Sequence, residues 1–266
     1  MSETTTGDKL MFDWLRAPKE QIQAWDQMRS CASELPIPPP TEQETEISID
    51  PLLAICLARG YHQFAQAPDG TRGMSKKAYA ALWPRTIRIN AMEIRNHSSA
   101  LLVDRTISPE GLSRLVPLEL RSVKPGTCRD RVAPPCDSEE KPLRRYIALI
   151  TYGPSPTHRE LTTTADEYCE QLPPEVTPLV AIEAVHVAVQ YGDKLCRWHL
   201  RNVGPYSMRV PGTTVGTDEV ICLRRDHHRK LLLGTSGRRI CNNEPGREIN
   251  DFCGNASRLT QVIPVP

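Results

Sequence analysis

The sequence predicts an α+β fold that is mainly antiparallel β, with short inserted helices and a sandwich-like core. Two observations lead to this prediction. Short apolar runs rich in β-branched residues are separated by turn residues, which is typical of paired strands. The chain also has 24 prolines and only 3 phenylalanines, and proline-rich chains form many loops and few long helices. We therefore expect one domain with a core of antiparallel strands.

The longest apolar pattern lies in residues 176–203, and we expect the rest of the fold to be organised around it. An unbroken run rich in valine precedes Gly192 and Asp193, and alternating residues follow them. Gly-Asp between two such runs is turn chemistry, so the pattern predicts a long β-hairpin. A helix over residues 180–189 is the competing interpretation, but four valines against one glutamate favour the strand.

The chain is expected to have three parts. Residues 1–48 form an arm, in which apolar residues at helical spacing precede a polyproline stretch and an acidic run. Polyproline followed by acidic residues is typical of an extended linker. A β-rich globular domain is expected over residues 49–245. Residues 246–266 show no clear periodicity and are expected to be a C-terminal tail.

Short helices and strands follow one another within the expected domain. Capping residues mark three helices, which are expected at residues 50–59, 75–82 and 164–172. The first ends at Gly60, the second begins at Ser75, and Thr164 with Glu167 forms a capping box for the third. Strands are expected at residues 87–94, 100–103, 116–121 and 146–152, and a second hairpin at residues 220–223 and 230–233.

Composition narrows the classes of function. The chain has 33 Lys+Arg against 32 Asp+Glu, so it has no overall attraction to nucleic acid or membrane, and such binding needs a local patch. Nine cysteines are scattered along the chain, and its N-terminus has no apolar leader. These features predict reduced thiols in the cytosol or the nucleus. The longest apolar run is too short to span a bilayer, which needs about 20 residues.

One segment near the second hairpin is clearly basic. Six cations stand there against one aspartate, and such a patch can hold phosphates without sequence specificity. A nuclear-import signal and a solvated basic face are the alternatives. Trp198, His199 and Arg201 lie nearby if the two expected hairpins pair. The six candidate nucleic-acid-binding residues are Arg224, Arg225, Arg229, Lys230, Arg238 and Arg239.

Two groups of residues are candidates for catalysis or metal binding. Asp104 at a strand end and Glu119 on the next strand resemble a Mg²⁺ nuclease pattern, but Arg121 stands where a lysine is expected. Zinc ligands are present in number, yet no close Cys-x-x-Cys pair supports a structural site. We predict no catalytic residue, metal site or cofactor. The zinc candidates are Cys222, His227 or His228, Cys241 and Cys253.

Two stretches together resemble the thirty-kilodalton superfamily of plant-virus movement proteins. Residues 101–105 form an apolar strand that ends in Asp104 and is followed by Arg105. Residues 178–203 are similar to a strand of alternating valines, a polar turn and a returning strand. The residues that carry this second similarity are Pro178, Leu179, Glu183, Val185, Val187 and Val189, followed by Tyr191, Gly192, Asp193 and Lys194.

The resemblance implies a non-enzymatic viral accessory protein that binds single-stranded nucleic acid cooperatively and acts at plasmodesmata. Asp104 would be the family's characteristic aspartate, with a structural role. The expected partners are single-stranded RNA or a nucleocapsid, an anionic membrane surface and further copies of the chain. The expected locations are the host cytoplasm and cell junctions, with the nucleus as a further location. Two alternatives stay open: a rhabdovirus-like matrix protein, and a Mg²⁺-dependent nuclease that uses Asp104 and Glu119.

Overall fold

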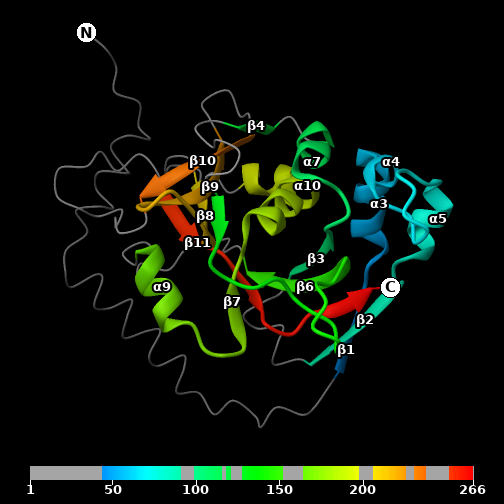
Figure 1. Cartoon of the computed structure of the whole chain (residues 1–266), viewed down its shortest axis with the longest axis horizontal. Helices are drawn as coiled ribbons and strands as arrows, with labels where there is room; N and C mark the ends of the chain where they lie inside the picture. Colours follow the sequence, from blue (N-terminus) through cyan, green and yellow to red (C-terminus); the bar gives the residue numbers. More distant parts are fainter. Residues whose placement is uncertain are drawn as a thin grey trace.

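The computed structural model confirms the predicted α+β class with a β-rich core, and its described residues form three sheets joined by helices (Figure 1). The expected arm lies outside the described residues, apart from residues 44–48, which form a strand. The structure describes residues 44–90, 99–115, 118–120, 128–151, 164–197, 206–225, 231–237 and 252–265.

A two-stranded sheet and three short helices come first along the described chain. Strands β1 (Glu44–Ser48) and β2 (Thr86–Asn90) pair antiparallel. Between them lie α3 (Asp50–Arg59), α4 (Tyr61–Phe64) and α5 (Lys76–Ala81). Gly60 ends α3 with a φ of 90°, a conformation that glycine adopts without strain. The Ser75 hydroxyl accepts a hydrogen bond from the amide of Ala78, so the predicted cap of α5 is confirmed.

A second sheet has the strand order β13-β6-β12-β7, and β3 pairs with the other edge of β6. All its described pairings are antiparallel. Helix α7 (Pro109–Leu115) follows β3. Helix α9 (Ala165–Gln171) carries the predicted capping box between Thr164 and Glu167, with both hydrogen bonds present. The strands are β3 (Ser99–Asp104), β6 (Arg145–Thr151), β7 (Val176–Pro178), β12 (Ser257–Leu259) and β13 (Ile263–Val265).

The third sheet contains the second expected hairpin. Its strand order is β11-β8-β9-β10-β4, and β5 pairs with β8. Strands β9 and β10 pair antiparallel over their full length, so the hairpin predicted there is confirmed. The pairs β10–β4 and β11–β8 are parallel. The strands are β4 (Leu118–Leu120), β5 (Cys128–Asp130), β8 (Tyr206–Val215), β9 (Glu219–Arg225), β10 (Leu231–Gly237) and β11 (Phe252–Asn255).

The hairpin predicted over residues 176–203 is wrong. Only β7 is a strand, and α10 (Ala181–Arg197) is a helix of 17 residues that includes the expected turn at Gly192 and Asp193. Residues 183–191 are all buried, and a valine-rich segment that is enclosed by the rest of the fold can be a helix as well as a strand. The helix propensity of valine is only a few tenths of a kcal/mol below that of the better helix formers, so packing decides the structure.

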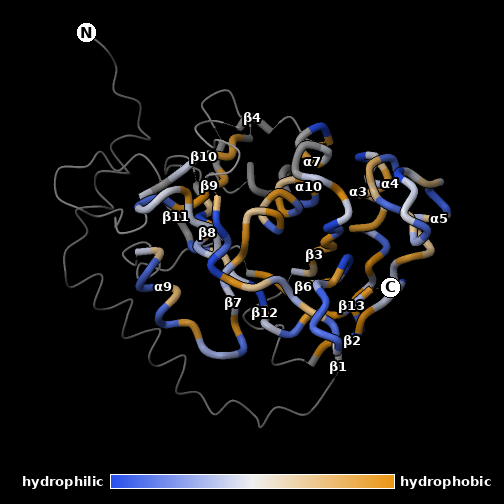
Figure 2. Tube along the Cα trace, viewed as in Figure 1, coloured by the Kyte–Doolittle hydropathy of each residue, from blue (hydrophilic) through white to orange (hydrophobic). Residues whose placement is uncertain are grey.

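Helix α10 is the central element of the fold. It packs against β3 of the second sheet, against β8 and β9 of the third, and against α3 and α7. Figure 1 shows it between the two larger sheets, and Figure 2 shows hydrophobic residues along it. The long apolar segment therefore organises the fold as expected, but as a helix.

Side chains of α10 occupy the free edge of β3. Gln190 accepts a hydrogen bond from the amide of Leu102 at 3.0 Å and donates one to the Leu102 carbonyl at 2.7 Å. The Tyr191 hydroxyl donates to the carbonyl of Ala100. Buried backbone groups at a sheet edge need partners, and here a helix supplies them in place of another strand.

The C-terminal residues join the two larger sheets rather than forming a tail. Residues 252–259 run from β11 in the third sheet directly into β12 in the second. Ala256, at the crossing, donates its amide to the carbonyl of Arg209 and accepts from the amide of Leu179. Gly212 in turn donates to the Leu179 carbonyl at 2.9 Å. The described residues 252–265 therefore supply strands to the two larger sheets.

Candidate nucleic-acid interface

The register of β9 and β10 places two of the six candidate cations at one end of the hairpin. Arg225 pairs with Leu231, and Arg224 pairs with Leu232. Both arginines therefore end β9 beside the five-residue connection that leads into β10. That connection, residues 226–230, includes Arg229 and Lys230 in the sequence and lies outside the described residues.

The other two candidates, Arg238 and Arg239, follow the last residue of β10 in the sequence. Gly237 ends β10 and pairs with Glu219, the first residue of β9. Strands of seven residues separate the two ends by about 20 Å. Arg238 and Arg239 lie outside the described residues, but the covalent chain attaches them directly to Gly237. The expectation of one six-residue patch therefore stays a prediction.

We use the name basic end for the four cations Arg224, Arg225, Arg229 and Lys230. These four cations occur within seven residues and share that segment with a single carboxylate, Asp226, and two histidines. Such a charge density attracts polyanions locally even though the whole chain is almost neutral. Trp198, His199 and Arg201 lie outside the described residues. The hairpin that was expected to bring them close is a helix that ends at Arg197.

Asp104 is the centre of a buried network and is fully enclosed. Its Oδ2 accepts from Nε of Arg145 at 3.1 Å, and its Oδ1 accepts from the amide and hydroxyl of Thr106 at 3.0 and 2.5 Å. Arg145 is 1% exposed, and it also donates to the carbonyl of Gln66. These contacts agree with the predicted structural role of Asp104. Its carboxylate joins the end of β3 to the start of β6 at Arg145 and to the following loop at Thr106.

Asp104 and Glu119 do not share a hairpin, so that part of the nuclease hypothesis is wrong. Asp104 ends β3, which pairs with β6 in the second sheet. Glu119 lies in β4, whose described partner is β10 in the third sheet, where Glu119 pairs with Leu232. Among the described residues, no group of three or more His, Cys, Asp and Glu side chains is placed to hold a metal ion.

A second buried ion pair fixes the start of α10. Oε1 of Glu183 accepts from Nε of Arg258 at 2.7 Å and from the hydroxyl of Tyr146 at 2.8 Å. Its Oε2 accepts from the amide of Val180 at 3.0 Å, next to the helix N-terminus. Burial, followed by the nearby charge of Glu183, raises the pKa of Tyr146 well above its usual range. Glu183 thus ties the helix to β6 and β12.

His186 is a buried histidine with partners on both ring nitrogens. Nε2 accepts from the amide of Asp104 at 3.3 Å, and Nδ1 lies 2.9 Å from the hydroxyl of Tyr61. Since Nε2 accepts, the neutral ring carries its proton on Nδ1. Burial lowers the pKa of His186 from 6.5 to about 4, although Asp104 acts in the opposite direction. His186 is therefore a core histidine of α10 with both ring nitrogens hydrogen-bonded.

The lowered pKa of His186 makes the stability of the protein depend on pH. Below pH 6.5 the unfolded chain binds a proton that the native ring does not, so the free energy of unfolding falls until about pH 4. The loss is at most about 1.4 kcal/mol per pH unit, or about 3 kcal/mol in all. In urea unfolding at pH 7.0, 5.5 and 4.5, His186→Gln should lose less stability than the wild type. Parallel curves for the two proteins would contradict this account.

The zinc candidates Cys222 and Cys253 lie in β9 and β11 with β8 between them, and the other candidate ligands lie outside the described residues.

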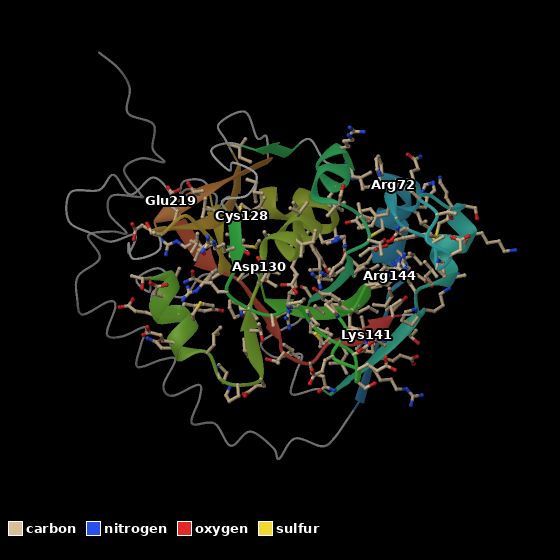
Figure 3. All side chains as sticks on the ribbon, viewed as in Figure 1. Arg72, Cys128, Asp130, Lys141, Arg144 and Glu219 are labelled. Atoms are coloured by element: carbon tan, nitrogen blue, oxygen red, sulfur yellow. The ribbon has the colours of Figure 1, made fainter. Side chains whose placement is uncertain are left out.

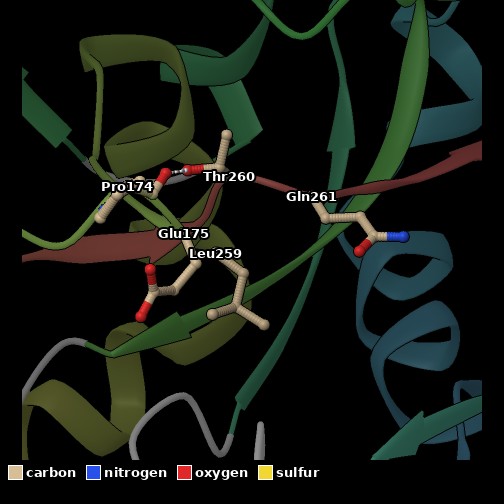
Figure 4. Close-up of a pocket in the computed structure, with 5 residues that line it drawn as sticks. All are labelled: Pro174, Glu175, Leu259, Thr260 and Gln261. Atoms are coloured by element: carbon tan, nitrogen blue, oxygen red, sulfur yellow. Dashed lines mark hydrogen bonds between the residues drawn. The ribbon is translucent and has the colours of Figure 1, made fainter.

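An open surface pocket of about 440 Å³ lies at the start of β7 (Figure 4). Thr260 in this pocket donates its hydroxyl to the carbonyl of Pro174 at 3.0 Å. Its remaining lining residues are Glu175, Leu259 and Gln261.

Comparison of the chain with protein-family models, with curated proteins and with solved structures finds no match. Within the described part of the chain, no helix combines the length and the apolar character that crossing a bilayer requires.

Proposed function

We propose that this chain is a non-enzymatic nucleic-acid-binding protein that contacts phosphates through the basic end. The observation that supports the proposal is the β9–β10 register, which places Arg224 and Arg225 beside the connection that carries Arg229 and Lys230. Cations that are close together in the chain at the end of a hairpin can contact successive phosphates without reading sequence. The expected ligand is single-stranded RNA.

The viral accessory role is a narrower proposal that depends on the resemblance to movement proteins. Of the two stretches that carry it, residues 101–104 lie in a strand that ends at Asp104, as that family's pattern requires. The second stretch is largely helix α10, so it no longer supports the resemblance. Nucleic-acid binding has separate support from the charge of the basic end, and it is the part of the proposal to test first.

Replacing all four residues of the basic end with alanine should weaken RNA binding about tenfold or more at low salt. Each lost phosphate contact also reduces the slope of log K against log salt, by about 0.7 for single strands, so the slope should fall by up to about 3. Fluorescence anisotropy with a labelled unstructured RNA, measured from 50 to 300 mM salt, gives both quantities. Unchanged affinity and slope would exclude the basic end as the RNA contact.

A matched control removes the same charge from another surface. Arg72, Lys76, Lys77 and Lys141 are all exposed, and Figure 3 shows Arg72 and Lys141 on the opposite side of the molecule from Glu219 of β9. Replacing these four with alanine should leave the salt slope unchanged. A second arm uses vesicles with anionic headgroups. Binding to vesicles but not to RNA, lost in the basic-end variant, would favour the matrix-protein alternative instead.

A further inference from the structure

Two exposed arginines come together at Gln66, in the loop that follows α4. This loop folds back on itself, so that Gln66 and Arg72 form an antiparallel bridge. Residues opposite each other in such a bridge direct their side chains to the same face, with Cβ atoms about 5 Å apart. Arg144, just before β6, donates to Oε1 of Gln66 at 2.9 Å. Figure 3 shows Arg72 and Arg144 on the same side of the molecule.

Buried groups beneath the loop hold Gln66 in place. Its backbone amide donates to the hydroxyl of Thr106 at 2.9 Å, and its carbonyl accepts from the guanidinium of Arg145. Arg145 is itself fixed by its ion pair with Asp104. The loop is therefore anchored to the buried network at the end of β3. Side chains that are already positioned lose less conformational freedom when a ligand binds.

No carboxylate neutralises these two arginines. Among the described residues, neither Arg72 nor Arg144 takes part in an ion pair. Asp69 is the only acidic residue in the loop sequence, and its Oδ1 accepts from the amide and hydroxyl of Thr71. Those bonds, rather than an arginine, lower the pKa of the Asp69 carboxyl. Two guanidinium groups held close together without a counter-charge repel each other, so a bound anion would stabilise them.

Gln66 adds a third donor to the two arginines. Its Oε1 already accepts from Arg144, which leaves the two N–H groups of the same amide free to donate. We propose that Arg72, Arg144 and the Gln66 amide bind a phosphomonoester. This group has three unesterified oxygens, one for each donor, and a charge of about −2 near neutral pH. Arginine also matches phosphate oxygens with its planar fork of N–H groups.

This phosphomonoester site is separate from the basic end and does not depend on the proposed function. An internal phosphate of RNA has only one negative charge and two unesterified oxygens, so it matches the three donors less well. Removal of Arg72 in the four-residue control variant should therefore leave the salt slope of RNA binding unchanged, as stated above.

Isothermal titration calorimetry at pH 7.5 and low salt compares three probes on the wild-type protein: phenyl phosphate, diphenyl phosphate and benzoate. One charge-assisted hydrogen bond contributes about tenfold in affinity. Phenyl phosphate should therefore bind at least about tenfold more tightly than the diester or the carboxylate. Equal affinity for the three probes would overturn the proposal, because it would show only a general attraction to anions.

Variants assign the phosphate to the two arginines. Arg72→Gln with Arg144→Gln should weaken phenyl phosphate binding at least about tenfold. Arg129→Gln is the matched control, because Arg129 is also an exposed arginine and lies in β5, between Cys128 and Asp130, which Figure 3 labels. This control should bind phenyl phosphate as the wild type does. Unchanged binding in the double variant would overturn the assignment.

Two further measurements complete the test. The basic-end variant should bind phenyl phosphate normally, and the double arginine variant should keep the salt slope of RNA binding, so failure of one proposal is distinguishable from failure of the other. The phosphomonoester can come from a small molecule or from a phosphorylated side chain. Free O-phosphoserine and a short peptide that contains it distinguish these sources, because tighter binding of the peptide would identify a phosphorylated protein as the ligand. Binding of neither would overturn the proposal.

Discussion

Asp104→Ala is expected to lower the free energy of unfolding by about 3–5 kcal/mol. The substitution leaves the guanidinium of Arg145, which is 1% exposed, without its carboxylate partner. It also removes the acceptor of the amide and hydroxyl of Thr106. An unpaired buried charge cannot recover the hydration that it lost on folding, so the cost is much larger than that of a surface pair. Urea unfolding monitored by circular dichroism measures it.

Two controls distinguish the buried charge from other causes. Glu139 is also half of an ion pair with a cation, Lys141, but both side chains are more than two-thirds exposed. Glu139→Ala should therefore cost less than about 1 kcal/mol. The double variant Asp104→Leu with Arg145→Met removes both charges and should be more stable than Asp104→Ala alone. Equal losses in Asp104→Ala and Glu139→Ala would show that the buried pair contributes little.

Measuring the stability of an Asp104 variant also tests the nuclease alternative. If Asp104 were a Mg²⁺ ligand, Asp104→Asn would abolish Mg²⁺-dependent cleavage of RNA while the fold stayed intact. The contacts of Asp104 with Arg145 and Thr106 instead predict a loss of stability for this variant. Cleavage by the wild type that disappears in a fully folded Asp104→Asn protein would restore the enzyme hypothesis.

Elements that are fixed by local chemistry could be predicted from the sequence. Ser75 and Thr164 offer hydroxyls to helix N-terminal amides, and Gly60 accepts the left-handed conformation that ends α3. These interactions involve residues at most four positions apart, so they can be recognised without knowledge of the tertiary fold. The strands β3 and β6 and the β9–β10 hairpin were predicted correctly for a similar reason.

The central helix was missed because its valines locally favour a strand, and packing in the fold outweighs that preference. The signal that identifies α10 is in its polar residues. Glu183, His186 and Gln190 are three and four positions apart, which is helical spacing, and each bonds a different neighbour. In a strand, Glu183 and His186 would lie on opposite faces of the sheet. The spacing of the polar residues therefore favours the helix, whereas the valine content favours the strand.

The composition of the candidate site was only partly predictable. The hairpin was expected, but its register was not, and the register separates Arg224 and Arg225 from the end at Gly237. Nothing in the sequence shows that β11 lies beside β8 in parallel. Pairing between strands so distant in the chain depends on the whole fold rather than on local chemistry.

Gly212→Ala is expected to lower the free energy of unfolding by at least about 3 kcal/mol, which is the upper part of the range for overpacked cores. Gly212 lies in β8, where the pairing with β9 shifts between Val210 and Thr214. A Cβ there would lie 2.9 Å from the carbonyl carbon of Leu179, and still closer to its oxygen. These atoms are backbone and cannot rotate away. The two backbone segments, at Gly212 and at Leu179, would have to move apart. The hydrogen bond from the Gly212 amide to the Leu179 carbonyl would then break.

Gly216→Ala is the matched control for this prediction, because it lies only four residues further along the chain. Gly216 has a φ of 61°, which strains other residues, but a Cβ there meets nothing within 4 Å. Its substitution should therefore cost only about 1 kcal/mol, from backbone strain alone. A larger loss in Gly212→Ala than in Gly216→Ala would show that the close approach of β8 to the segment before α10 holds the third sheet against the second. Equal losses would contradict that conclusion, because only general backbone strain would then be needed to explain both.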